Sequence, residues 1–174
     1  MTDPTQTSRR RLPDVALPPV AGGPAVPLRA HRRAAVLVLL NAAEDAAAAD
    51  GATADGTAAD GTAAEASAGV FLRHLADAAP TLADWDGRVL VIVGGAAARP
   101  DGMGAAAAPG LSFPVLADPP HAIAAAAGVA APALVIADQW GEVHVAAPAA
   151  PGQGWLPLPE IEQWLRFLAV RCAG

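Results

Sequence analysis

The residues of this chain best suited to chemistry are one cysteine and four histidines. The 174-residue sequence has a single cysteine, Cys172, third from the end. A lone cysteine cannot form an internal disulfide, and no Cys-x-x-Cys pair or Cys/His zinc spacing is present. The histidines His31, His74, His121 and His144 are far apart and share no ligand spacing. We therefore expect no metal and no cofactor, and Cys172 as the only candidate for thiol chemistry.

The carboxylates and glycines that could belong to a site are better explained by local structure. Asp118 precedes prolines and an alanine-rich run, which is the position of a helix N-cap rather than of an acid catalyst. Asp138 and Gly141 have the spacing of a turn. Gly94-Gly95 follows an apolar run as a phosphate loop would, but the chain has no GxGxxG motif and no lysine. We exclude a nucleotide site.

An Asp-Gly pair recurs every five residues, at Asp50, Asp55 and Asp60, in an Ala/Thr background that ends at Glu65. A period of five fits neither a helix nor a strand, and Asp-Gly is typical of turns. The carboxylates lack the spacing of an EF-hand or another calcium loop. We predict a flexible, low-complexity insertion over residues 43–66.

Charge and composition exclude two classes of partner. The net charge is −6, whereas binding to nucleic-acid phosphates needs a surplus of cations. The clusters at 9–11 and 32–33 are too short to reverse this balance. No window approaches the roughly 20 apolar residues of a membrane-spanning helix. The N-terminus lacks the apolar run of a signal peptide, so a cytoplasmic location is expected.

The apolar pattern predicts the strands of an α/β domain. Residues 34–40, 88–93 and 134–137 are continuously apolar, as in central strands buried on both faces. Residues 113–116 predict a short strand or extended segment. Residues 142–146 follow the turn after the third apolar run and predict a hairpin.

Three helices are expected between and after these strands. The first begins near Val70 and is expected to end at Pro80, because proline lacks the N–H of a helical residue. The second covers 118–127, with Gly128 as its C-cap. The third covers 158–169, where apolar residues recur at spacings of three and four.

The N-terminal segment divides into two parts. Residues 1–11 are polar and predict a disordered tail. Residues 12–28 contain five prolines and Gly22-Gly23, a composition that excludes central strands. It allows two short edge strands around a turn at 21–23, which predicts a β-hairpin.

Two motifs together carry a resemblance to a known family. The run Phe113-Pro-Val-Leu-Ala-Asp-Pro119 and the spacing Gly128-Val … Pro132 … Asp138 … Gly141 resemble the second half of thioredoxin-fold proteins of the peroxiredoxin and alkyl-hydroperoxide-reductase (AhpC/TSA) branch. The N-terminal segment is similar to the hairpin of that branch. The resemblance implies an α/β, thioredoxin-like domain over 12–174, a central mixed sheet flanked by helices with an N-terminal β-hairpin extension.

The resemblance also implies a catalytic cysteine that this chain lacks. The family places a thiolate at the start of the helix after the first core strand, where the helix dipole lowers its pKa. That place corresponds to residues between Ala42 and Phe71, which include no cysteine. Ser67 and the nearby threonines cannot substitute, because an alcohol does not form a sulfenic acid. We therefore assign no catalytic residue.

Pro132 matches the proline that thioredoxins place before the third core strand. Peroxiredoxins often have an arginine there, so this chain departs from them at that position. We expect the Ala131–Pro132 bond to be cis, which costs little for an X-Pro bond. The alternative is a trans proline that opens the strand.

Two functions follow from these observations. The first is a peroxiredoxin-like thioredoxin-fold protein that has lost its peroxidatic cysteine and is a non-catalytic binding or structural module. It would bind a protein partner or itself, through a strand edge or a helix face. The alternative is a thiol-dependent antioxidant oxidoreductase with Cys172 in an intermolecular disulfide. Trp140 and Trp155 lie in turn or loop segments and are either exposed binding anchors or core residues.

Overall fold

The computed structural model describes residues 10–30, 32–41, 68–95, 111–118, 120–149 and 154–172. The expected insertion at 43–66, and the expected tail up to residue 9, lie outside these residues. Arg10 and Arg11, which the sequence assigned to the tail, belong to the described part: Arg11 forms a β-bridge with Glu142.

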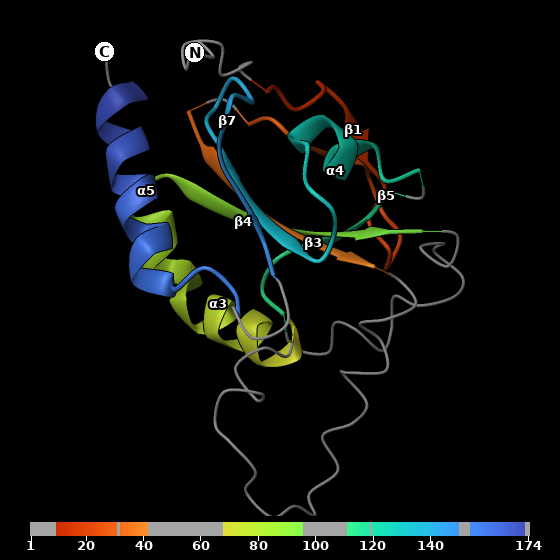
Figure 1. Cartoon of the computed structure of the whole chain (residues 1–174), viewed down its shortest axis with the longest axis horizontal. Helices are drawn as coiled ribbons and strands as arrows, with labels where there is room; N and C mark the ends of the chain where they lie inside the picture. Colours follow the sequence, from red (N-terminus) through yellow and green to blue (C-terminus); the bar gives the residue numbers. More distant parts are fainter. Residues whose placement is uncertain are drawn as a thin grey trace, which may run out of the picture.

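A five-stranded mixed sheet forms the centre of the molecule, in the order β5-β4-β3-β6-β7 (Figure 1). β3, β4 and β5 are parallel, whereas β6 and β7 pair antiparallel. The carboxyl ends of β3, β4 and β5 therefore meet the start of β6 at one edge, which we call the Asn41 edge. The strands are β3 Ala34–Asn41, β4 Gly87–Gly94, β5 Val115–Asp118, β6 Ala133–Ala137 and β7 Val143–Pro148.

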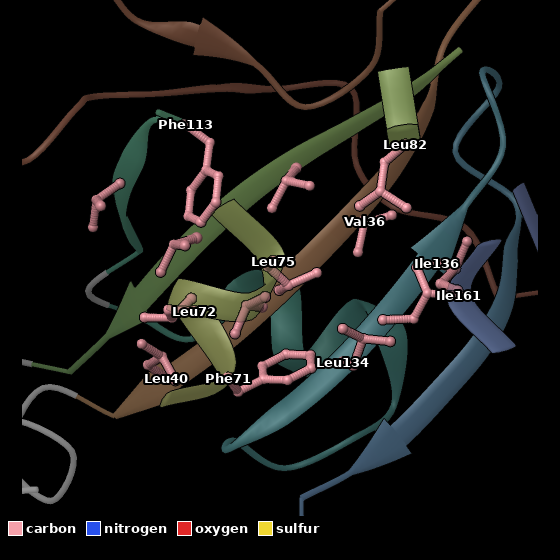
Figure 2. Packing of buried hydrophobic residues seen from close by; sticks show 14 of the residues in the cluster. Val36, Leu40, Phe71, Leu72, Leu75, Leu82, Phe113, Leu134, Ile136 and Ile161 are labelled. Atoms are coloured by element: carbon pink, nitrogen blue, oxygen red, sulfur yellow. The ribbon is translucent and has the colours of Figure 1, made fainter. Parts of the chain in front are cut away.

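Helices cover both faces of the sheet (Figure 1). α3 (Ala68–Ala83) and α5 (Leu158–Cys172) pack on one face, and the short α4 (Ala122–Ala127) lies on the other. Successive side chains of a strand point to opposite faces of the sheet, so alternate residues of β3 are buried under different helices. Val36 and Val38 join the cluster under α3 and α5, while Leu37 joins the cluster under α4. Figure 2 shows the first cluster, where Phe71, Leu72 and Leu75 of α3 point toward the strands.

The predicted N-terminal hairpin is present as the antiparallel strands β1 (Ala16–Leu17) and β2 (Val26–Pro27). Arg88 on β4 attaches it to the sheet: its Nη2 donates to the carbonyls of Pro27, at 2.7 Å, and Leu28, at 2.8 Å. Burial, with the neighbouring charge of Arg33, lowers the pKa of Arg88. Leu28 is itself buried in the cluster under α4, so the hairpin contributes to the core.

The first helix differs from the prediction at its end. Pro80 lies inside α3, which continues to Ala83. Proline removes one helical hydrogen bond, but the last turn carries Leu82, which is fully buried in the core. Burial of Leu82 therefore outweighs the local rule that placed the end at Pro80. The third helix also extends further than expected, to Cys172.

Two other elements are displaced at their ends. The short strand expected at 113–116 is β5, which begins at Val115 and continues to Asp118. The helix expected over 118–127 is shorter at its start, since α4 begins at Ala122. Gly128 ends it in the left-handed conformation, as predicted for a C-cap. Among the described helices, none combines the length and apolar character needed to cross a bilayer.

Candidate functional site

The Asn41 edge is where the family resemblance places the chemistry. Asn41 is the last residue of β3, and its side-chain Nδ2 donates to the carbonyl of Ala131 at 3.0 Å. The Ala131–Pro132 bond is cis, as predicted. Because β6 pairs antiparallel with β3, the proline loop lies directly beside the end of β3. The segment that would carry the family's cysteine, between Ala42 and Phe71, contains none, and residues 42–67 of it lie outside the described residues.

Two titratable side chains lie further along this edge, at the ends of β4 and β5. Asp118 is buried, and its Oδ2 accepts the N–H of Ile123 at 2.8 Å. The Asp118 carboxylate thus binds an N–H in the first turn of α4, but Asp118 is the last residue of β5 and the N-cap position is His121, so the predicted N-cap is wrong by three residues. The ring of His121 packs so closely on Gly94 that a Cβ at Gly94 would overlap it. Since Gly94 pairs with Asn41, the His121 imidazole lies one strand from the Asn41 amide.

Sequence reasoning missed the position of His121. Its backbone has φ 54°, a left-handed conformation that histidine adopts more readily than most residues, and its N–H donates to the Asp118 carbonyl at 3.0 Å. This tight turn brings the ring back over the sheet. The one indication in the sequence was Gly94 at the end of β4, because a glycine in a strand can mark the close approach of another group. The described part of the edge therefore offers an amide, an imidazole and a proline, but no thiol.

Trp155 lies on the face of the sheet that α3 and α5 cover, against the first turns of α3. Its ring stacks on Phe71, with centroids 4.6 Å apart and planes 6° from parallel. This contact supports self-packing for Trp155, one of the two alternatives for the loop tryptophans. Its Nε1 is buried and has no hydrogen-bond acceptor among the described residues. Trp140, by contrast, is 50% exposed.

We expect Trp155→Phe to change the free energy of unfolding by less than about 1 kcal/mol, because it keeps a stacking ring and removes an unpaired buried donor. Trp155→Ala removes the stacking partner and is expected to cost about 2 kcal/mol. Urea denaturation followed by circular dichroism measures both. Equal losses in the two variants would show that the indole N–H contributes more than the stack.

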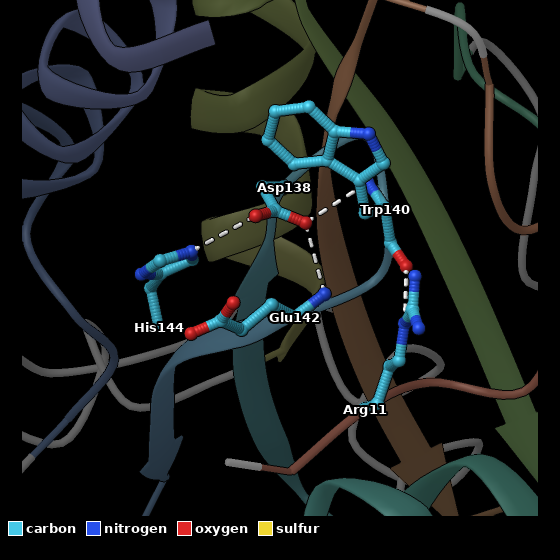
Figure 3. A network of polar contacts seen from close by, with 5 residues as sticks. All are labelled: Arg11, Asp138, Trp140, Glu142 and His144. Atoms are coloured by element: carbon cyan, nitrogen blue, oxygen red, sulfur yellow. Dashed lines mark hydrogen bonds and ion pairs between the residues drawn. The ribbon is translucent and has the colours of Figure 1, made fainter.

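A second polar cluster lies at the turn between β6 and β7 (Figure 3). Asp138 is buried, and its Oδ1 accepts the N–H groups of Trp140 and Glu142, both at 2.9 Å. Its Oδ2 lies 3.3 Å from Nε2 of His144. Arg11 joins the cluster by donating its Nε to the Trp140 carbonyl at 2.8 Å. Asp138 thus holds the turn, as predicted, and His144 is a partner that the sequence did not reveal.

The pair of Asp138 and His144 has the form of the carboxylate and the general base of a catalytic triad, which also needs a nucleophile on the other ring nitrogen. The serine and threonine of the described residues are Ser112 and Thr81, and neither hydrogen-bonds to His144. The His144 ring instead faces Trp164 of α5, with centroids 6.5 Å apart. The described contacts therefore give this pair a structural role, joining the hairpin to α5.

Cys172 lies far from the Asn41 edge. It is the last residue of α5, whereas the sequence predicted that it lies beyond a helix ending at residue 169. α5 begins just after Trp155, and by Leu165 it has reached Gly87, the first residue of β4. Gly87 marks the end of the sheet opposite the Asn41 edge. Position 172 lies about 10 Å further along the helix.

The histidines remain separate in the structure. His74 is exposed on α3, His121 lies at the Asn41 edge, and His144 lies on β7, while His31 lies outside the described residues. No three His, Cys, Asp or Glu side chains of the described part are grouped as metal ligands would be.

Comparison with known proteins shows the fold. No family model and no curated protein matches the chain. Among solved structures, an uncharacterised conserved protein from Geobacillus kaustophilus has a TM-score of 0.60 at 18% identity, over 94% of this chain and 82% of its own. Peroxiredoxin Q from Xanthomonas campestris has a TM-score of 0.59 at 16% identity, over 91% and 96%. A putative thiol:disulfide interchange protein DsbE from Chlorobium tepidum has a TM-score of 0.57 at 17% identity, over 95% and 97%. The chain has a thioredoxin-like fold with an N-terminal hairpin.

Proposed function

We propose that this thioredoxin-like chain is a peroxiredoxin-like module without redox catalysis, which binds a partner protein or another copy of itself. The observation that carries the proposal is the location of the single cysteine. The only cysteine of the sequence is Cys172, at the end of α5, and the sheet edge with Pro132 lies at the opposite end of the strands.

Thiol peroxidases and disulfide oxidoreductases need a thiolate at the start of a helix or beside a positive charge. Position 172 is at the C-terminus of α5, where the helix dipole is negative and does not favour an anion. A thiol there is poorly activated for attack on a peroxide. The alternative, an intermolecular disulfide through Cys172, would use the residue without that activation, and it is tested by the same variant.

The test is a pair of turnover assays, with hydrogen peroxide and with a protein disulfide as substrates and dithiothreitol as reductant. We expect the wild-type chain and Cys172→Ser to give equal rates, no faster than buffer. Turnover by the wild type that disappears in Cys172→Ser would establish the oxidoreductase alternative. Turnover retained by Cys172→Ser would contradict both readings, because it would require catalysis without a thiol.

A control defines the sensitivity of the assay. A thioredoxin-fold peroxidase with an intact cysteine, run at the same concentration, sets the rate that the family resemblance implies. The cytoplasmic location expected from the N-terminal sequence stays a prediction.

A further inference from the structure

The outward face of α5 carries the two most exposed large apolar side chains of the described residues. Phe167 is 51% exposed and Val170 is 78% exposed. Trp164, half-buried beside them, meets Phe167 edge to face with ring centroids 5.9 Å apart. Apolar rings gathered on one exposed helix face are typical of a protein–protein contact.

Charged residues frame this apolar face in a definite order. Glu160, Trp164, Phe167 and Arg171 follow one another at spacings of four, three and four, and therefore form one stripe along the helix. Glu160 lies in the first turn of α5 and Arg171 in the last. Neither charge has an ion-pair partner among the described residues. The stripe is acidic at one end, aromatic in the middle and basic at the other end.

We propose that α5 is the interface of a homodimer in which two copies of this helix pack antiparallel. A two-fold axis between residues 165 and 166 relates the stripe to itself in reverse order. Glu160 then faces the partner's Arg171, and Trp164 faces the partner's Phe167. Both ends of the stripe form opposite-charge pairs, and both rings gain an aromatic neighbour. The order of the four residues is complementary to itself only in this orientation.

The surface of α5 also has the shape that such packing needs. A hollow of about 650 Å³ is lined by Pro157, Pro159, Glu160, Gln163, Trp164 and Phe167. Glu160, Gln163, Trp164 and Phe167 lie around one position on the helix surface, as do the four residues of a hole in helix–helix packing. In the antiparallel register this hole lies opposite the partner's Phe167.

Other arrangements of the helix are disfavoured by charge. A parallel pair would place Glu160 against the partner's Glu160 and would also bring two arginines together, which is repulsive. In the antiparallel pair the two 172 positions are about 20 Å apart along the helix axes, too far for a disulfide. The dimer is therefore expected to form without Cys172.

The test uses two charge-reversed variants, Glu160→Arg and Arg171→Glu, in sedimentation equilibrium from micromolar to millimolar protein. We expect the wild type to reach twice the 17.3 kDa mass of one chain. Each variant alone is expected to dimerise at least about tenfold more weakly, because both pairs become repulsive. A mixture of the two variants is expected to regain wild-type affinity as a heterodimer, since each pair is then again of opposite charge.

Matched variants separate the interface from helix stability. Phe167→Ala is expected to weaken dimerisation about tenfold or more, and Cys172→Ser with reductant is expected to leave it unchanged. Circular dichroism confirms that each variant retains its helix. A wild type that stays monomeric, a dimer insensitive to all α5 changes, or single variants that do not recover on mixing would each overturn the proposal. None of these outcomes depends on whether the protein has redox activity.

Discussion

Replacing Asp138 with alanine is expected to lower the free energy of unfolding by about 3 kcal/mol. The carboxylate is buried, and its Oδ1 accepts the backbone N–H groups of Trp140 and Glu142. Its Oδ2 also pairs with His144, whose side chain is 10% exposed. Alanine would leave two turn N–H groups and one partly buried imidazole without this acceptor. Urea denaturation, followed by circular dichroism and tryptophan fluorescence, measures the loss.

Two further variants separate the contributions of the turn and of the ring. Asp138→Asn keeps an oxygen for the turn N–H groups and removes the charge beside His144, so we expect about half the loss. His144→Ala leaves the turn intact and removes the ring that faces Trp164. If Asp138→Asn is as costly as Asp138→Ala, the charge on the carboxylate, and not the turn, accounts for its effect.

The elements that the sequence predicted well are those whose signal is local. The strands β3, β4 and β6 are continuously apolar, and a run buried on both faces needs no information from elsewhere in the chain. Gly128 and Asp138 were also identified correctly, because a helix C-cap and a tight turn are set by neighbouring residues. Pro80 is the exception. Proline was expected to end the helix there, but the helix continues for three residues because Leu82, on the same turn, is buried in the core.

The contacts of the candidate site could be predicted only in part. Pro132 was identified from its place before an apolar strand and from the family resemblance. Asn41 was not, because its hydrogen bond to Ala131, the residue before Pro132, depends on the antiparallel pairing of β3 and β6 across 90 positions of sequence. The packing of His121 on Gly94 similarly depends on β4 and β5 being adjacent. Pairing between strands far apart in the sequence therefore determines which side chains lie at the Asn41 edge.

The same pairing separates the two surfaces that the proposals concern. The parallel strands β3 and β4 run from the end near Leu165 to the Asn41 edge, so the middle of α5 lies away from that edge. A dimer through the outward stripe of α5 would therefore not involve Pro132 or Asn41.

The second large effect concerns the core that holds both surfaces in place. Leu134→Ala is expected to cost about 3 kcal/mol of unfolding free energy. Leu134 is fully buried on β6, between β3 and β7, where it pairs with Val38 and Ala147. Its side chain belongs to the cluster under α3 and α5 shown in Figure 2. Alanine would leave a cavity that two strands and two packed helices cannot easily close. Urea denaturation gives the loss, with an unchanged dependence on urea if the native state stays compact.

Two controls test whether this cost comes from packing at that position. Leu134→Met keeps the volume and is expected to cost less than about 1.5 kcal/mol. Val15→Ala removes atoms from a side chain that is 40% exposed, and should change stability by no more than about 0.5 kcal/mol. A loss below about 1 kcal/mol for Leu134→Ala would mean that the core relaxes around the missing atoms. The close packing between the sheet and its two long helices would then be contradicted, and with it the rigid support from which α5 presents its outward stripe.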